Sequence, residues 1–282
     1  MAISAADVRK LREETGAGMM DCKKALGATD GNFEDAKDFL RKSGIQKAAK
    51  KADRGTGEGR VEATISADGK SGCLIAVECE TDFAARNDSF GALIDELGAH
   101  GLKNSPADAA DMLGQKLDSG QTVDERIKSL VGTIGENMRL SNVTWCENSA
   151  GRIGAYIHHD QKQGVLVNLT TEAAGDVADD MIRKVGMHVA SMRPTALSKD
   201  ELPEDLVTRE RNIYLDDASL KSKPEEIQEK IISGKMDRFF AENTLLSQPF
   251  VVDDSKTVEK AVEDALGAGS KIAGFSLFRV GE

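Results

Sequence analysis

Histidine and cysteine are the residue types in this sequence that could bind a metal ion or transfer protons. The chain has four of each, and no two cysteines stand in a CxxC pair. His158 and His159 lie where a predicted strand ends, without Cys, Asp or Glu at the spacing of a metal site. His100 and His188 take matching positions in two predicted helices, which favours a packing role. We therefore expect no metal ion and no cofactor, and we interpret the cysteines as buried thiols.

The short motifs that cradle phosphate groups or activate nucleophiles do not occur. The 282 residues contain no GxxxxGK[ST], GxSxG or HExxH stretch. GTGEGR at 55–60 has glycines spaced like a dinucleotide fingerprint, but it follows a basic helix and precedes a strand. A dinucleotide site needs the order strand, turn, helix. We interpret this stretch as a linker, and nothing in the sequence indicates an enzyme.

The residues ECETDFAARND at 78–88 place an aromatic side chain among acids and polar residues. They follow the apolar run CLIAV, which is where a core aromatic would be expected. One alternative is a helix N-cap followed by a core residue, Phe83. The other is a short loop that carries Asp82 and Phe83 out from the surface. The elements on either side bear on this choice.

The first fifty residues are predicted to form three short helices with tight turns. Ser4 can cap a helix that ends at Gly16, a second helix covers about 20–28, and a third covers 32–43 before Gly44. The residues that follow, IQKAAKKADRGTGEG, are basic and rich in glycine, and they indicate a domain boundary.

From Arg60 onward the apolar residues alternate with polar ones, which predicts a hairpin that turns at Asp68-Gly69. A second hairpin is predicted from about Met138 through Ile157, with VLVNL as its return strand. Between the hairpins, helices are predicted at about 88–103, 107–118 and 122–135, the last capped by Thr122.

The two hairpins are similar when one is shifted by 92 residues, so we expect an internal repeat. Gly72 and Leu74 then meet Gly164 and Leu166, and the helices that follow match at a shift of 88, as His100 and His188 do. The first copy therefore carries four extra residues at or beside TDFA, residues 81–84. This insertion favours the protruding loop.

Past Pro194 the pattern departs from the repeat. Leu206, Ile213 and Leu220 are seven residues apart, and with a second helix after Pro224 they predict a helical hairpin with an apolar seam. The hairpin precedes a final strand, AGFSLFRV at 273–280, which is expected to complete the second sheet. The fold class is thus α+β, with these expected parts: an N-terminal bundle and linker at 1–54, a first core subdomain at 55–136, a second one begun at 137–202, the inserted hairpin at 203–247, and completion of the second subdomain at 248–282.

The charge balance argues against a nucleic-acid-binding protein. The chain carries 37 Lys and Arg against 48 Asp and Glu, for a formal net charge of −11, and only residues 1–54 are net basic. The N-terminal residues lack the apolar core of a signal peptide, and no stretch reaches membrane length. We expect a protein partner, no direct nucleic acid, no membrane and a cytoplasmic location.

Two stretches carry a resemblance to a known family. LREETGAGMMDCKKAL at 11–26 resembles the N-terminal signature of the bacterial elongation factor Ts family, and VECETDFAARND at 77–88 resembles its second signature. Ala84 stands where a larger aliphatic residue is common in that family. The similarity continues through YIHHDQKQGVLV, GMHVA, KPEEI and SLFRVGE, and so covers nearly the whole chain.

The resemblance implies a ubiquitin-associated-like N-terminal bundle, a core of two similar α+β subdomains and an inserted coiled-coil hairpin used for dimerisation. Many members continue after VGE into a C-terminal helical module, whereas this sequence ends at Glu282. Any partner contact made by that module is not expected here.

The resemblance also implies a function, guanine nucleotide exchange on elongation factor Tu in its GDP-bound and nucleotide-free forms. It assigns the displacement of the partner's Mg²⁺ to Thr81, Asp82, Phe83 and Ala84. It assigns partner binding to Arg12, Met19, Met20 and His158. A methionine pair beside a glycine commonly fills a core, so the alternative is that one of the two, Met19 or Met20, packs inside the head. From the residues alone a different function stays open, a non-catalytic dimeric adaptor that binds a protein surface through its N-terminal bundle.

Overall fold

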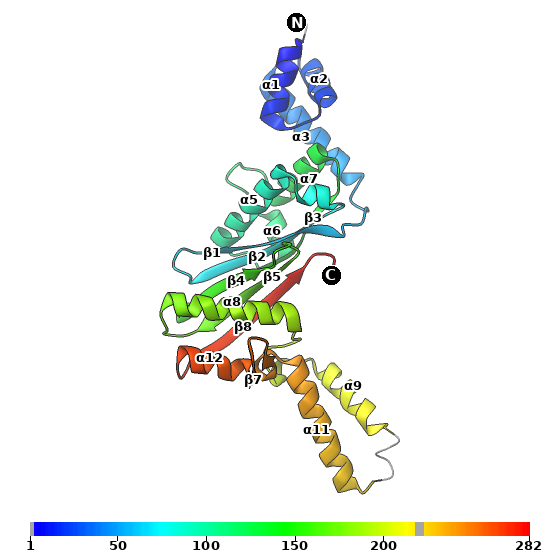
Figure 1. The fold of residues 1–282 in the computed structure, drawn as a ribbon. Coiled ribbons are helices and arrows are strands. Elements are labelled where there is room, and N and C mark those ends of the chain that lie inside the picture. Colours follow the sequence, from blue (N-terminus) through cyan, green and yellow to red (C-terminus); the bar gives the residue numbers. More distant parts are fainter. Residues whose placement is uncertain (1–2, 218–222) are drawn as a thin grey trace.

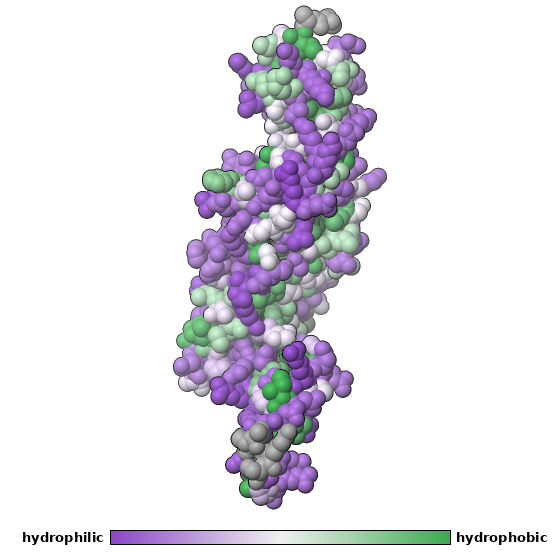
Figure 2. All heavy atoms as spheres, turned by 90° about the vertical axis from the view of Figure 1, so that its right-hand side faces the viewer, coloured by the Kyte–Doolittle hydropathy of each residue, from purple (hydrophilic) through white to green (hydrophobic). Residues whose placement is uncertain are grey.

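The computed structural model describes residues 3–217 and 223–282 of an elongated α+β molecule. A small helical head lies at one end, two sheets with their covering helices form the body, and a helical hairpin projects from the other end (Figure 1). The α+β class predicted from the sequence is confirmed. On the face shown in Figure 2, hydrophilic side chains predominate along the whole length, and apolar ones occur in small separate groups.

The head consists of α1 (Ala5–Thr15), α2 (Met19–Ala28) and the first part of α3 (Phe33–Ala49). Ser4 caps α1 in a capping box with Asp7, and α1 ends at Gly16, both as predicted for Ser4 and Gly16. Small and branched apolar residues fill the centre of the head: Val8, Leu11, Ala17, Cys22, Ala25, Leu26 and Ala36.

Helix α3 does not end before Gly44 as predicted, and it continues to Ala49. Gly44 is buried where α3 crosses α7 (Val123–Ile134), and a Cβ added to Gly132 of α7 would lie 2.4 Å from the Cα of Gly44. Glycine therefore serves here to bring two helices together, and not to stop one. As a consequence, α3 belongs to both the head and the body.

The first sheet has the antiparallel order β1-β2-β3, formed by β1 (Glu58–Ile65), β2 (Ser71–Cys79) and β3 (Met138–Glu147). Its outer face is covered by α5 (Asp88–Asn104), α6 (Ala109–Gly114) and α7 (Figure 1). The main core lies between these layers and includes Ile75, Val77, Phe90, Leu97 and Val131. Thr122 caps α7 as predicted, whereas α6 is shorter than the predicted 107–118.

The second sheet has the order β4-β5-β8, formed by β4 (Gly151–Ile157), β5 (Gln163–Thr170) and β8 (Lys271–Arg279). Its outer face is covered by α8 (Gly175–Met192) and α12 (Val258–Leu266). The prediction of a continuous strand from Met138 through Ile157 is wrong. The chain turns at 148–150, and the residues before this turn form β3, which pairs with β2 in the first sheet. The final strand completes the second sheet as predicted.

The inner faces of the two sheets pack on each other around a small apolar cluster: Val61, Leu74, Ala76, Ile153 and Leu166. A Cβ added to Gly72 would lie 3.1 Å from Cδ1 of Leu166, and one added to Gly164 would lie 3.2 Å from Cδ1 of Leu74. Gly72 and Leu74 match Gly164 and Leu166 in the shift by 92 residues. The contacts across this interface are therefore reciprocal.

The helices on the two outer faces each bury a histidine that bonds to a glutamine. His100 Nε2 of α5 lies 2.9 Å from Gln115 Oε1, and His188 Nε2 of α8 lies 2.9 Å from Gln248 Oε1. Burial lowers the pKa of the His188 imidazole, with the bond to Gln248 opposing the shift. The packing role predicted for these two histidines is confirmed.

The hairpin is formed by α9 (Glu204–Leu215) and α11 (Glu225–Asn243), preceded by the 3-10 turn η1 (Lys199–Glu201). Its seam joins Ile232, Met236 and Phe239 to Leu206, Val207 and Tyr214. Ile213 is 54% exposed and does not lie in this seam, and Leu220 lies outside the described residues. After α11, the 3-10 turn η2 (Leu245–Ser247) and the strands β6 (Pro249–Phe250) and β7 (Asp253–Thr257) lead into α12.

The four cysteines form no disulfide, and three of them are buried. Burial raises the pKa of Cys73 and of Cys79 to about 12 and that of Cys146 to about 11. The prediction of buried thiols is confirmed for all but Cys146, which is half-buried. None of the helices within the described ranges has the length and apolar character needed to cross a membrane.

Candidate functional site

A one-turn helix, α4 (Asp82–Ala85), lies directly after β2 and carries Phe83 on its outer side. Phe83 is 80% exposed, whereas its neighbours Ala84 and Ala85 are buried against the body. The alternative that Phe83 is a core aromatic is therefore wrong. The connection that contains α4 spans residues 80–87, and the corresponding one between β5 and α8 spans only 171–174.

The base of α4 is held by hydrogen bonds from Thr81. The Thr81 hydroxyl accepts from the backbone N–H of Ala84 at 3.3 Å, so Thr81 is the N-cap of the helix. Thr81 also donates through its backbone N–H and its hydroxyl to the carboxylate of Glu136, at 3.0 Å and 2.8 Å. Asp82 forms an ion pair with Arg86 at 3.2 Å, one turn further along.

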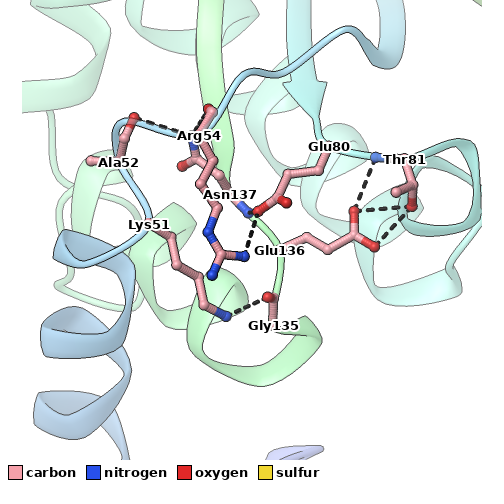
Figure 3. Close-up of polar contacts among 8 residues, drawn as sticks. All are labelled: Lys51, Ala52, Arg54, Glu80, Thr81, Gly135, Glu136 and Asn137. Atoms are coloured by element: carbon pink, nitrogen blue, oxygen red, sulfur yellow. Dashed lines mark hydrogen bonds and ion pairs between the residues drawn. The ribbon is translucent and has the colours of Figure 1, made fainter.

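Glu136 belongs to a polar cluster that joins the end of α3, the start of β3 and the end of β2 (Figure 3). The Glu80 carboxylate accepts from the backbone N–H of Asn137 at 2.6 Å and lies 3.4 Å from the Arg54 guanidinium. The Asn137 amide donates to the carbonyl of Arg54 at 2.8 Å, and Lys51 donates to the carbonyl of Gly135. The linker after α3 is thus fastened beside α4.

Glu78 is a fully buried carboxylate near the end of β2, shortly before α4. It forms an ion pair with Arg139 at 2.6 Å on the neighbouring strand β3, and it accepts from the Thr56 hydroxyl at 2.9 Å. The backbone N–H of Gly281 lies 3.4 Å from its other oxygen. A buried charge needs such partners, and here they join the linker and the C-terminal residues to the end of β2.

His158 lies in the turn between β4 and β5, half-buried, with its Nδ1 2.8 Å from the Tyr156 hydroxyl. This turn is joined to β1, because Val61 donates to the carbonyl of Gln161 at 2.7 Å. In the same turn, a hydrogen bond to Glu58 raises the pKa of Lys162, and the nearby charge of Asp82 acts in the same direction. The structure therefore brings the turn with His158 to the side of the body that carries α4.

Arg12, Met19 and Met20 lie in the head, on α1 and at the start of α2, and all three are exposed. Met19 is 42% exposed and Met20 is 73% exposed, so the alternative that one of them fills the core is wrong. The head lies at the end of α3 that is farther from the sheets (Figure 1). These residues therefore form a second group, separate from α4 and the turn with His158.

The arrangement is suited to contact with another protein. It offers an exposed aromatic ring on a helix whose base is fixed by hydrogen bonds, and a second apolar site with Met19 and Met20 on the head. Within residues 3–217 and 223–282, no three His, Cys, Asp or Glu side chains are grouped so that they could hold a metal ion.

Glu136 and Asn137 were not among the residues singled out from the sequence. They stand in the segment GEN at 135–137, between the end of a capped helix and the start of a strand. The only local signal is a polar pair in a short connection. Their partners are far along the chain, as Thr81 is for Glu136.

Comparisons with known proteins agree with the two signatures. The family model described as Elongation factor TS matches residues 80–282. The elongation factor Ts of Hydrogenovibrio crunogenus is 42% identical over 282 residues, with 100% of this chain and 92% of that protein covered. That of Aquifex aeolicus is 38% identical over 289 residues, with 100% of this chain and 99% of that protein covered. This chain therefore belongs to the elongation factor Ts family.

Proposed function

We propose that this chain is a guanine nucleotide exchange factor that binds elongation factor Tu and accelerates the release of GDP. The observation that carries the proposal is Phe83, an exposed aromatic ring on a helix whose base is held by Thr81 and Glu136. Single apolar side chains are common on the surface of monomers, so exposure alone does not mark a contact. An 80% exposed aromatic ring on a helix whose base is fixed by hydrogen bonds supports one.

The proposed action is displacement of the Mg²⁺ site in the partner. A GTPase holds GDP through a phosphate-binding loop and a Mg²⁺ ion that needs near-octahedral oxygen geometry. Insertion of Phe83 between elements of the partner moves the groups that hold this ion, and Asp82 competes for nearby hydrogen-bond donors. Thr81 and Ala84 carry the backbone that presents them, and no covalent bond is made or broken by this chain.

The free energy gained by burying Phe83 in the partner is large enough to weaken nucleotide binding strongly. Burial of an aromatic side chain removes about 150–250 Å² from water, which at 25 cal/mol per Å² is worth about 4 kcal/mol at the lower end of this range. If that free energy is coupled to distortion of the partner's site, nucleotide affinity falls by roughly a thousandfold, at 1.4 kcal/mol for each factor of ten. By linkage, bound nucleotide weakens this chain's affinity by the same factor, so exchange is accelerated in both directions.

Arg12, Met19 and Met20 are proposed to bind the nucleotide-binding domain of the same partner, and His158 a further domain. The two exposed methionines support this, because their side chains are flexible and apolar and are not part of the core of the head. Because α3 is packed on α7, the head is attached to the body that carries α4, and both can contact one partner at the same time.

The architecture that we propose beyond the α+β class is a ubiquitin-associated-like head, a core of two copied subdomains and a dimerising hairpin. The reciprocal contacts of Gly72 and Gly164, and the matched pairs of His100 and His188 with glutamine, support the copied subdomains. The exposed Ile213 and Ile227 of the hairpin support a contact with a second copy. We propose action in the cytoplasm, without direct contact with nucleic acid or membrane.

The test is a release assay with elongation factor Tu loaded with fluorescent GDP. Substoichiometric amounts of this chain, added with excess unlabelled GDP, are expected to accelerate release until all bound nucleotide has exchanged. A chain that binds the factor without changing the rate of release is an adaptor, and that outcome refutes the proposal.

A further inference from the structure

Glu136 is the one acidic side chain that bonds to the base of α4 among the hydrogen bonds of the described residues. It lies in the turn between α7 and β3, half-buried, and its two carboxylate oxygens lie 2.8 Å and 3.0 Å from the Thr81 hydroxyl. One of them also accepts from the Thr81 backbone N–H at 3.0 Å. Thr81 itself lies immediately before the helix that carries Phe83.

These bonds set the direction of the Thr81 hydroxyl. A threonine hydroxyl has one proton and two lone pairs, and a carboxylate can only accept. The proton therefore points to Glu136, and a lone pair is turned toward the N–H of Ala84, which it caps. Hydrogen bonds to an ionised group are stronger than neutral ones, so this carboxylate holds the cap firmly.

Helix α4 depends on such support because it has only four residues. A single turn is not stable by itself, since helix formation begins with an unfavourable nucleus. On its inner side α4 is held by the buried Ala84 and Ala85, and at its start by Thr81. Without the bonds to Glu136, the start of the helix keeps its packing and the cap on Ala84, but the Thr81 side chain is no longer fixed, and the direction of Phe83 is held less firmly.

Glu136 also lies in the cluster that holds the linker from the head. The carbonyl of its neighbour Gly135 accepts a hydrogen bond from Lys51, and the side-chain amide of its other neighbour, Asn137, donates to the carbonyl of Arg54 (Figure 3). One short turn therefore contacts both the end of α3 and the start of α4. The placement of Phe83 relative to the head is set at this turn.

We propose that Glu136 is a positioning residue for nucleotide exchange, which acts through Thr81 to hold Phe83 in the direction that the partner requires. The inference rests on the proposed exchange function. It concerns a residue that does not itself touch the partner's nucleotide site.

The test measures kcat and KM for GDP release from elongation factor Tu·GDP with the full chain and its variants. Glu136→Ala and Thr81→Val, which removes the hydroxyl and keeps the shape, are each expected to lower kcat about tenfold, the effect of one lost charge-assisted hydrogen bond. KM is expected to change less than about twofold, because the head still binds. The double variant is expected to be slower than either single one by much less than the product of the two effects, because the bond between the Thr81 hydroxyl and Glu136 is lost in both.

Two further variants separate positioning from general effects. Thr81→Ser keeps the hydroxyl and is expected to keep most of the rate. Glu147→Ala removes an exposed carboxylate at the other end of β3 and is expected to match the wild-type rate. Amide hydrogen exchange of Ala84, Ala85 and Arg86 in the unbound chain is expected to be faster in Glu136→Ala than in the wild type.

The outcomes distinguish the two proposals. A wild-type chain that does not accelerate GDP release refutes the exchange function, and this inference with it. An active wild type with unchanged kcat in Glu136→Ala and Thr81→Val refutes this inference alone. A loss of rate that comes entirely from higher KM, or a slow rate in Glu147→Ala, also refutes it, because the effect is then on binding or on charge.

Discussion

Phe83 and Phe90 are seven residues apart and have opposite environments. Phe83 is 80% exposed on α4, whereas Phe90 is fully buried on the inner side of α5. The same residue type thus serves the surface in one place and the core in the other. This pair allows the functional and the structural value of an aromatic ring to be measured in one protein.

Phe83→Ala is expected to change the free energy of unfolding by less than about 1 kcal/mol, as surface substitutions do, and to reduce the acceleration of GDP release sharply. Phe90→Ala, the matched control, is expected to cost about 3–5 kcal/mol, because it leaves a cavity in the core. Urea unfolding and the release assay measure the two quantities. A Phe83→Ala chain that unfolds easily, yet exchanges normally where it is folded, would contradict the role given to this ring.

His188 is expected to make stability fall as the pH is lowered. Burial lowers its pKa in the folded state below the ordinary value of 6.5, so the unfolded chain takes up a proton first. The contribution is complete above that value and is lost as the pH falls from it toward the folded pKa. Urea unfolding between pH 7.5 and 5 is expected to show a smaller pH dependence in His188→Asn than in the wild type.

Because His188→Asn lowers stability at every pH, the comparison is between slopes and not between absolute values. Equal slopes in the wild type and His188→Asn would show that this imidazole titrates alike in the folded and unfolded chains.

At the scale of elements, the crossing of α3 and α7 determines how the head is attached. The backbones approach at Gly44 and Gly132, where a Cβ added to Gly132 would lie 2.4 Å from the Cα of Gly44. An ion pair between Arg41 of α3 and Glu125 of α7, at 2.7 Å, also joins the two helices. The attachment therefore depends on a close backbone contact more than on the charged pair, which is partly exposed.

Gly132→Ala is expected to destabilise the chain by about 1–3 kcal/mol, since the added methyl group forces the helices apart. It is also expected to raise KM in the release assay by moving the head. Gly234→Ala is the matched control within α11, where an added Cβ meets nothing within 4 Å. That variant is expected to gain up to about 1 kcal/mol from helix propensity, and a loss there would contradict the argument.

Local signals in the sequence were sufficient for the helix starts at Ser4 and Thr122, because a cap depends on residues three apart. They failed at Gly44, because a glycine that ends a helix and one that lets two helices meet look alike until the partner helix is known. The break between β3 and β4 was missed because strand pairing is decided by contacts far along the chain. Helix α12 was not predicted, although Thr257 caps it.

For the candidate site, the exposure of Phe83 could be predicted from the four-residue insertion. The exposure of Met19 and Met20 was left open, since a head core of small residues could have needed one of them. Glu136 could not be predicted, because its role exists only when the turn before β3 is brought beside the end of β2. A hydrogen bond between distant segments has no periodic signal in the sequence.

At the scale of the whole molecule, the head and the hairpin lie at opposite ends of a long body (Figure 1). The seam between α9 and α11 uses Val207 and Tyr214, and it leaves Ile213 and Ile227 on the surface. These two side chains are 54% and 46% exposed, which makes them candidates for contact with a second copy. They are far from α4 along the body.

The double variant Ile213→Asp, Ile227→Asp is expected to convert any dimer to a monomer without loss of stability greater than about 1 kcal/mol, because both positions are exposed. Light scattering at several protein concentrations measures the mass. Deletion of about residues 205–230 is expected to have the same effect and to leave the body folded. A body that fails to fold after the deletion would show that the hairpin is not an insertion.

The connection after β2 holds a helix, and the shorter connection after β5 does not. In the proposed architecture of two copied subdomains, only the first therefore carries a helix with an exposed aromatic ring in this connection. Each chain accordingly has one proposed exchange site, and a saturated complex should contain one elongation factor Tu for each chain. In a dimer joined through the hairpins each chain keeps its own α4, and turnover counted per chain is expected to be the same as in the monomer.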